Sequence, residues 1–242
     1  MSIRSRLLQG IAANSFGQVA AVLIQVFSVP IFIKFWGVEL YGEWLLINTI
    51  PAYLNMCDIG FTTITANEMT MLVSGGERSK ALDIFQSTWL LLCFISAIIL
   101  GISLSVTWFL PVEVWFRFTH IAHFELAVIL ILLSLYVLVG LQTRLLLAGF
   151  RCEGQYALGT FLNTLLLLME YVAVAIIIYW GGTPVHAACS FFIMRLLGTV
   201  WIRLILMQRR SWIVFGAQNA SIDTIRRLVR PALSFMAFPM GN

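Results

Sequence analysis

The chain has 242 residues, of which 60% are hydrophobic and only 11% are charged, and its mean hydropathy is +0.94. A soluble domain carries about 25% charged residues, so this composition excludes an ordinary soluble protein. The formal net charge of +4 reflects basic residues that report membrane topology, and we expect no nucleic-acid partner. The composition predicts an all-α polytopic membrane protein.

Six stretches of the chain are long and apolar enough to cross a bilayer, which takes about 20 residues in a helix. They run from Leu8 to Trp36, Tyr41 to Leu72, Phe85 to Leu110, Phe124 to Leu147, Ala157 to Trp180 and Val185 to Met207. The connections are short, so neighbouring spans are expected to be antiparallel. Pro51 interrupts the second stretch and predicts a kink or a break there. Residues 1–210 are thus expected to form one lobe of six transmembrane helices.

The lysines and arginines predict the orientation of this lobe. Arg195 lies within a span, and if the spans alternate, only Lys34 and Arg117 fall on one side of the membrane. The other twelve basic residues fall on the opposite side. By the positive-inside rule the N-terminus and the segment after the sixth span are cytoplasmic.

The end of the chain has a different pattern. Residues 211–230 are more polar, and Ile222, Ile225 and Leu228 alternate with Arg226 and Arg227, which is typical of an amphipathic helix at an interface. We expect a cytoplasmic amphipathic linker here. The apolar run at 231–242 predicts the start of a seventh transmembrane helix, so we expect the chain to be a fragment of a longer protein.

Three ionisable side chains, Asp58, Glu170 and Arg195, fall near the middle of apolar stretches. Such groups are costly inside a bilayer and usually face a bundle interior, a partner charge or a water-filled pathway. Glu170 and Arg195 lie on adjacent antiparallel spans, so they either form a structural ion pair or line a substrate or proton path. Asp58 is either a proton relay or a neutral, hydrogen-bonded group that stabilises the kink.

Polar residues on the spans form stripes. At about 100° per residue, Asn14, Gln18 and Gln25 share one face of the first span, and Thr199 lies one turn from Arg195. Stripes on otherwise apolar helices are expected to face inward. We therefore assign a substrate pathway to Asn14, Gln18, Gln25, Arg195 and Thr199. For Gln18 and Gln25, simple hydrogen bonding between helices, at about 0.6 kcal/mol each, remains an equal alternative.

No motif for enzymatic chemistry stands out. The four cysteines have no paired spacing, and no further Cys, Asp or His cluster completes a metal site with the pair His120 and His123. Nucleophile elbows, phosphate-binding glycine loops and dinucleotide fingerprints do not occur in the sequence. We expect no enzymatic activity, no cofactor and no metal.

Two runs in the first third of the chain resemble a known family. The run from Gly37 to Phe61, preceded by Pro30, and the run from Ala66 to Thr70 with its turn at 75–78 resemble the opening of the polysaccharide-biosynthesis or O-antigen flippase family. This family shares a superfamily with the multidrug and toxic-compound extrusion transporters and the lipid II flippase. Beyond Arg78 the resemblance is one of topology and spacing.

The resemblance implies a transporter with two helical lobes around a central cavity in the bacterial cytoplasmic (inner) membrane. The implied cargo is undecaprenyl-diphosphate-linked oligosaccharide, with membrane lipid and a coupling ion, proton or sodium, as further partners. Arg195 would bind the diphosphate, because a guanidinium can contact two oxygens at once. The chain holds one lobe, so we expect transport to need a second lobe or a second copy.

Two other functions are alternatives to a flippase. An antiporter of small organic cations on the same scaffold would use the carboxylates of Asp58 and Glu170 as binding groups. A membrane-bound glycosyl or acyl transferase would need an acid, base or metal cluster at a membrane face, and the sequence lacks one.

The predicted topology can be tested by cysteine labelling. In a background without the four native cysteines, a cysteine introduced at Gly76 should resist a membrane-impermeant maleimide in intact cells and react after permeabilisation. Labelling of this cysteine in intact cells would refute the predicted orientation.

Overall fold

The computed structural model describes residues 3–56, 60–109, 118–210 and 212–228. Every regular element among these residues is helical, as the composition predicts. The helices are α1 (Ile3–Met56), α2 (Phe61–Ser74), α3 (Arg78–Phe109), α5 (His123–Cys152), α6 (Tyr156–Tyr179) and α7 (Pro184–Arg209). Asp58 and the run at 231–242 lie outside the described residues.

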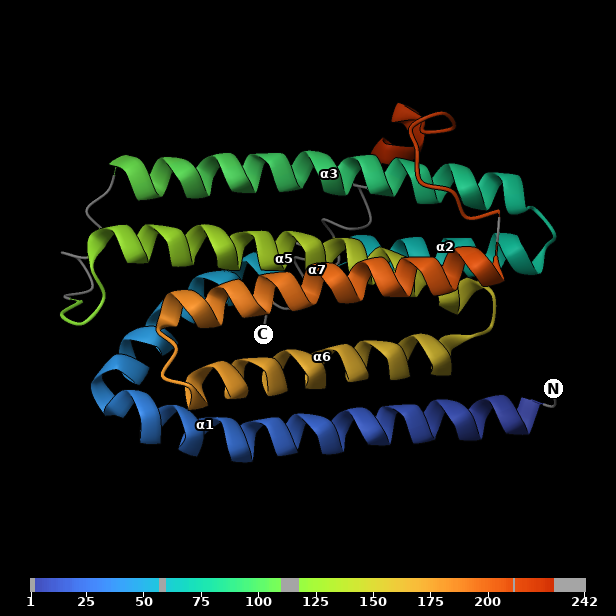
Figure 1. The fold of residues 1–242 in the computed structure, drawn as a ribbon. Coiled ribbons are helices and arrows are strands. Elements are labelled where there is room, and N and C mark those ends of the chain that lie inside the picture. Colours follow the sequence, from blue (N-terminus) through green and yellow to red (C-terminus); the bar gives the residue numbers. More distant parts are fainter. Residues whose placement is uncertain (1–2, 57–59, 110–117, 211, 229–242) are drawn as a thin grey trace, which may run out of the picture.

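Helix α1 consists of two arms that meet at Gly37. This residue has φ 78° and ψ 171°, which is not helical, and it separates residues 3–36 from residues 38–56. Glycine adopts such a positive φ at little steric cost because it lacks a Cβ. Figure 1 shows that the chain turns back here and that the second arm and α2 run toward the end of the bundle where the chain begins.

Five helices of the described chain are long and apolar enough to cross a membrane, one fewer than the six predicted spans. The difference arises in the second predicted span, Tyr41 to Leu72. Its first part belongs to α1, and its second part forms the separate α2, which has only 14 residues. Pro51 lies inside α1, and α2 begins after Gly60, which has a φ of 120°. Of the predicted kink or break at Pro51, the break is therefore wrong, because the helix continues through the proline.

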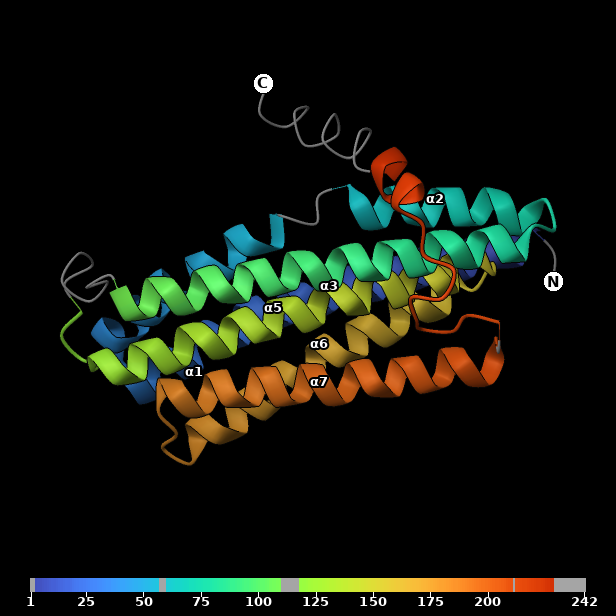
Figure 2. The same ribbon diagram turned by 90° about the horizontal axis from the view of Figure 1, so that it is seen from above.

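The helices form one bundle whose connections alternate between two ends (Figures 1 and 2). The first arm of α1 packs along α6, while α2, α3 and α7 all pack against α5. One end, called the basic end here, holds the start of α1, the turns at 75–77 and 153–155, and the end of α7. The opposite end holds Gly37, residues 118–122 and the turn at 180–183. This arrangement confirms the predicted antiparallel succession of helices.

Two apolar clusters form the core, one toward each end of the bundle. The cluster toward the basic end contains Phe85, Leu145 and Leu206, and the cluster toward the opposite end contains Trp44 and Phe191. On α5 the second cluster ends at Leu133 and the first begins at Leu138. A polar layer occupies the interval between them and includes Tyr136.

Polar contacts fasten both ends of the bundle. At the opposite end, the Glu43 carboxylate accepts hydrogen bonds from the backbone N–H groups of Thr119 and His120, at 2.7 and 3.0 Å. There the Trp36 indole N–H also donates to the Gly182 carbonyl at 2.8 Å. These bonds fix the bend of α1 against the loops beside it.

The segment at 212–228 is packed against the basic end. Glu153 accepts a hydrogen bond from the Trp212 indole at 2.8 Å and pairs with Arg210 at 2.7 Å. Gln86 is buried on α3, where it donates to the Val214 carbonyl and accepts from the Asn219 N–H. The expected linker thus lies against α3, and its short helix at 222–228 buries Leu228.

We expect Gly37→Ala to destabilise the protein by about 1–3 kcal/mol, because a residue with a Cβ is strained at this φ. The matched control is Gly42→Ala, a helical glycine in the same helix with open space around its Cβ position. Thermal unfolding in detergent measures both variants. A Gly37→Ala protein as stable as the control would show that the bend tolerates a side chain.

Candidate functional site

The polar layer in the middle of the bundle contains an ion pair between α6 and α7. Arg195 Nε lies 2.8 Å from Glu170 Oε1, and Nη2 donates a hydrogen bond of 2.8 Å to Oε2. The Tyr136 hydroxyl on α5 accepts a hydrogen bond from Arg195 Nη2 and donates one to Glu170 Oε2 at 3.2 Å. Three helices therefore meet at one network of charged and hydroxyl groups.

The ion pair within this network is almost completely buried. The side chain of Glu170 is 0% exposed and that of Arg195 is 8% exposed. Removing either partner from such a pair leaves an uncompensated charge in an apolar environment, which is strongly destabilising. Of the two predicted roles for these residues, the pairing is present in the structure.

The Thr199 side chain lies at the contact between α5 and α7. Its hydroxyl donates to the Arg195 carbonyl at 2.7 Å and makes a 2.6 Å hydrogen bond with the Thr143 hydroxyl. These contacts join α5 to α7, and Thr199 lines neither of the two cavities described next. Its position is that of a helix-to-helix contact.

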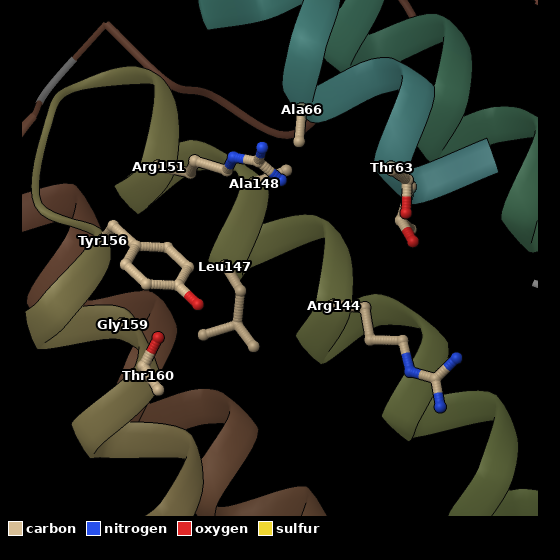
Figure 3. Close-up of a pocket in the computed structure, with 10 residues that line it drawn as sticks. Thr63, Ala66, Arg144, Leu147, Ala148, Arg151, Tyr156, Gly159 and Thr160 are labelled. Atoms are coloured by element: carbon tan, nitrogen blue, oxygen red, sulfur yellow. The ribbon is translucent and has the colours of Figure 1, made fainter. Parts of the chain in front are cut away.

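Two adjoining cavities lie along α5 and α6. The basic cavity has a volume of about 170 Å³ and lies nearer the basic end, between α2, α5 and α6. It is lined by Thr62, Thr63, Ala66, Arg144, Leu147, Ala148, Arg151, Tyr156, Gly159 and Thr160. Figure 3 shows both arginines projecting from α5, with α2 on one side and Tyr156 and Thr160 of α6 on the other.

The second, central cavity has a volume of about 250 Å³ and reaches the ion pair. It is lined by Tyr136, Val137, Gly140, Arg144, Leu147, Asn163, Leu167 and Arg195. Arg144 and Leu147 line both cavities, so the two adjoin, and together they are called the groove here. The groove extends from the basic end to the middle of the bundle.

The charge of this groove has a single sign. Three arginines line it, and no carboxylate is among its described lining residues. Glu170 contacts Arg195 but is not part of the lining. The groove therefore presents guanidinium, hydroxyl and amide groups, which suit an anion with several oxygens.

The predicted stripe on α1 reaches this groove at one point. The Asn14 side-chain oxygen accepts a hydrogen bond of 3.1 Å from the Tyr156 hydroxyl, which belongs to the basic cavity. Gln18 and Gln25 are exposed on the bundle surface and line neither cavity. Of the predicted pathway residues, the structure brings Asn14 and Arg195 to the groove.

Sequence reasoning missed Arg144, which is the residue common to both cavities. Because Arg144 lies close to the end of its span, it contributed only to the orientation. The useful signal was its spacing from Arg151: seven residues place both arginines on one face of a helix, about 10 Å apart along the axis. Tyr156 and Asn163 repeat this spacing on the next helix.

The chain matches no family model, no curated protein and no solved structure in the comparisons. The class of the protein therefore follows from its own composition and fold. It is a multi-pass helical membrane protein with a cationic groove along α5 and α6.

The ion pair predicts a specific pattern of stability. Arg195→Gln or Glu170→Gln alone should destabilise the protein by about 3–5 kcal/mol, because each leaves one buried charge without its partner. The double variant carries no net charge at the pair and should recover most of this loss. Thermal unfolding of the three variants in detergent tests this, and a double variant as unstable as the sum of the singles would contradict it.

Proposed function

We propose that this protein moves an amphiphile with a phosphorylated headgroup across the membrane, namely a polyprenyl-diphosphate-linked oligosaccharide for surface polysaccharide synthesis. The observation that carries this proposal is the groove lined by Arg144, Arg151 and Arg195 without a carboxylate among its described lining residues. The resemblance of residues 37–78 to the polysaccharide flippase family supports the same cargo. The proposed location is the bacterial cytoplasmic membrane, with the basic end in the cytoplasm.

The physical argument starts from the cargo. A diphosphate and its sugar cannot cross about 30 Å of hydrocarbon without polar partners. The groove offers such partners in succession: guanidinium groups for the phosphate oxygens, and Tyr156, Thr160 and Asn163 as hydrogen-bonding groups. The prenyl chain can stay in the surrounding lipid while the headgroup follows the groove.

The same observation weighs against an antiporter of organic cations. That function needs a carboxylate that faces the cargo, and the described candidate, Glu170, is paired with Arg195 instead. Three arginines would also repel a cation. For a transferase, the described lining of the groove offers no carboxylate to serve as an acid or base.

Photo-crosslinking tests the proposed cargo. A photoreactive polyprenyl-diphosphate-linked sugar should label the full chain in membranes, and Arg144→Gln should reduce this labelling at least fivefold because Arg144 lines both cavities. Arg209→Gln is the matched control, since Arg209 is exposed and lines neither cavity.

The controls separate the proposed function from its alternatives. A photoreactive quaternary ammonium probe should give only background labelling. Equal labelling of the wild type and Arg144→Gln by the diphosphate probe, or labelling by the ammonium probe that the diphosphate fails to block, would overturn the proposal.

A further inference from the structure

The Arg195 guanidinium has two edges with different surroundings. Its Nε and Nη2 atoms contact Glu170, and Nη2 also contacts the Tyr136 hydroxyl. Arg195 is at the same time part of the lining of the central cavity, whereas Glu170 is not. Arg195 therefore stands between a buried carboxylate and the groove.

We propose that Glu170 is a positioning residue that limits the affinity of the groove for its anionic cargo. This inference rests on the proposed function and adds a role to the ion pair. Glu170 holds Arg195 at the cavity wall and offsets much of its charge. An anion in the central cavity then meets only a compensated charge from Arg195.

Burial makes this compensation effective. Attraction between unit charges is several-fold stronger in a protein interior than in water, and the Glu170 side chain is 0% exposed. Solvent therefore screens its carboxylate little, and its repulsion of an anion in the adjoining cavity persists. Both carboxylate oxygens of Glu170 contact the Arg195 guanidinium, so its Nε and Nη2 groups are not available to donate hydrogen bonds to the cargo.

Limited affinity suits a protein that must release what it binds. A conduction path needs sites that attract the permeating group strongly enough for entry and weakly enough for exit. An arginine without a carboxylate partner in an apolar bundle would hold a diphosphate strongly. The pair with Glu170 therefore makes Arg195, in the middle of the bundle where the groove ends, a weaker contact for the cargo than an unpaired arginine would be there.

The test measures the affinity of the full chain in lipid nanodiscs for farnesyl diphosphate, with farnesol as the uncharged reference for partition into lipid. Glu170→Gln removes the internal anion and should lower the dissociation constant about tenfold. The matched control is Glu153→Gln, another buried and arginine-paired carboxylate that lines neither cavity. It should leave the dissociation constant within twofold of the wild type.

The double variant Glu170→Gln, Arg195→Gln tests whether the ion pair contributes to cargo binding at all, and it does so even if the single variant does not fold. It replaces the charged pair by neutral groups of similar size and should bind more weakly than the wild type, by at least threefold. A purely structural pair predicts no change in affinity for this variant.

The outcomes separate the two proposals. Tighter binding by Glu170→Gln together with weaker binding by the double variant supports the role of Glu170. If the wild type binds farnesyl diphosphate and the folded single variant binds it equally or more weakly, the inference is overturned. The inference also fails if the double variant binds like the wild type. Wild-type protein that prefers farnesyl diphosphate no more than farnesol overturns the proposed function and, with it, this inference.

Discussion

The ion pair between Arg195 and Glu170 holds three helices at a depth where neither water nor lipid can satisfy a charge. Each partner is tolerated there only because the other is present, and the Tyr136 hydroxyl bridges them from α5. The apolar clusters on both sides pack around this network. The relative positions of α5, α6 and α7, and hence the walls of the central cavity, depend on it.

The ion pair determines the charge of the groove, because it supplies Arg195 to the lining while the Glu170 carboxylate stays outside the lining. Because Arg195 covers the Glu170 carboxylate, the described lining holds arginines without acids. Polar contacts also hold the two ends of the bundle together. Glu43 fastens the loop beside the bend of α1, and Glu153 fastens the segment after α7. Glu43 and Glu153 thus hold parts of the structure together. The arginines of the groove are the charged groups that remain to bind a ligand.

The helices were predictable from the sequence because a helix that crosses a membrane needs a continuous stretch of about 20 apolar residues, and such a stretch is a local property of the sequence. Five of the six predicted spans agree with helices that can cross a membrane, and the second fails for a local reason. A proline such as Pro51 can stay inside a helix when its neighbours satisfy the freed carbonyl. The change of direction instead falls at Gly37 and the next helix start at Gly60, where positive φ angles are tolerated.

The sequence by itself determined the all-α class, the antiparallel order of the helices and the importance of Glu170 and Arg195, because burial of charge in an apolar stretch is costly wherever it occurs. Only the tertiary structure decided how these groups are used. It paired Glu170 with Arg195, placed Thr199 in a helix contact, left Gln18 and Gln25 on the surface, and brought Arg144 to the centre of the groove. Those outcomes depend on which helix lies beside which, and periodicity along one helix carries no information about its neighbours.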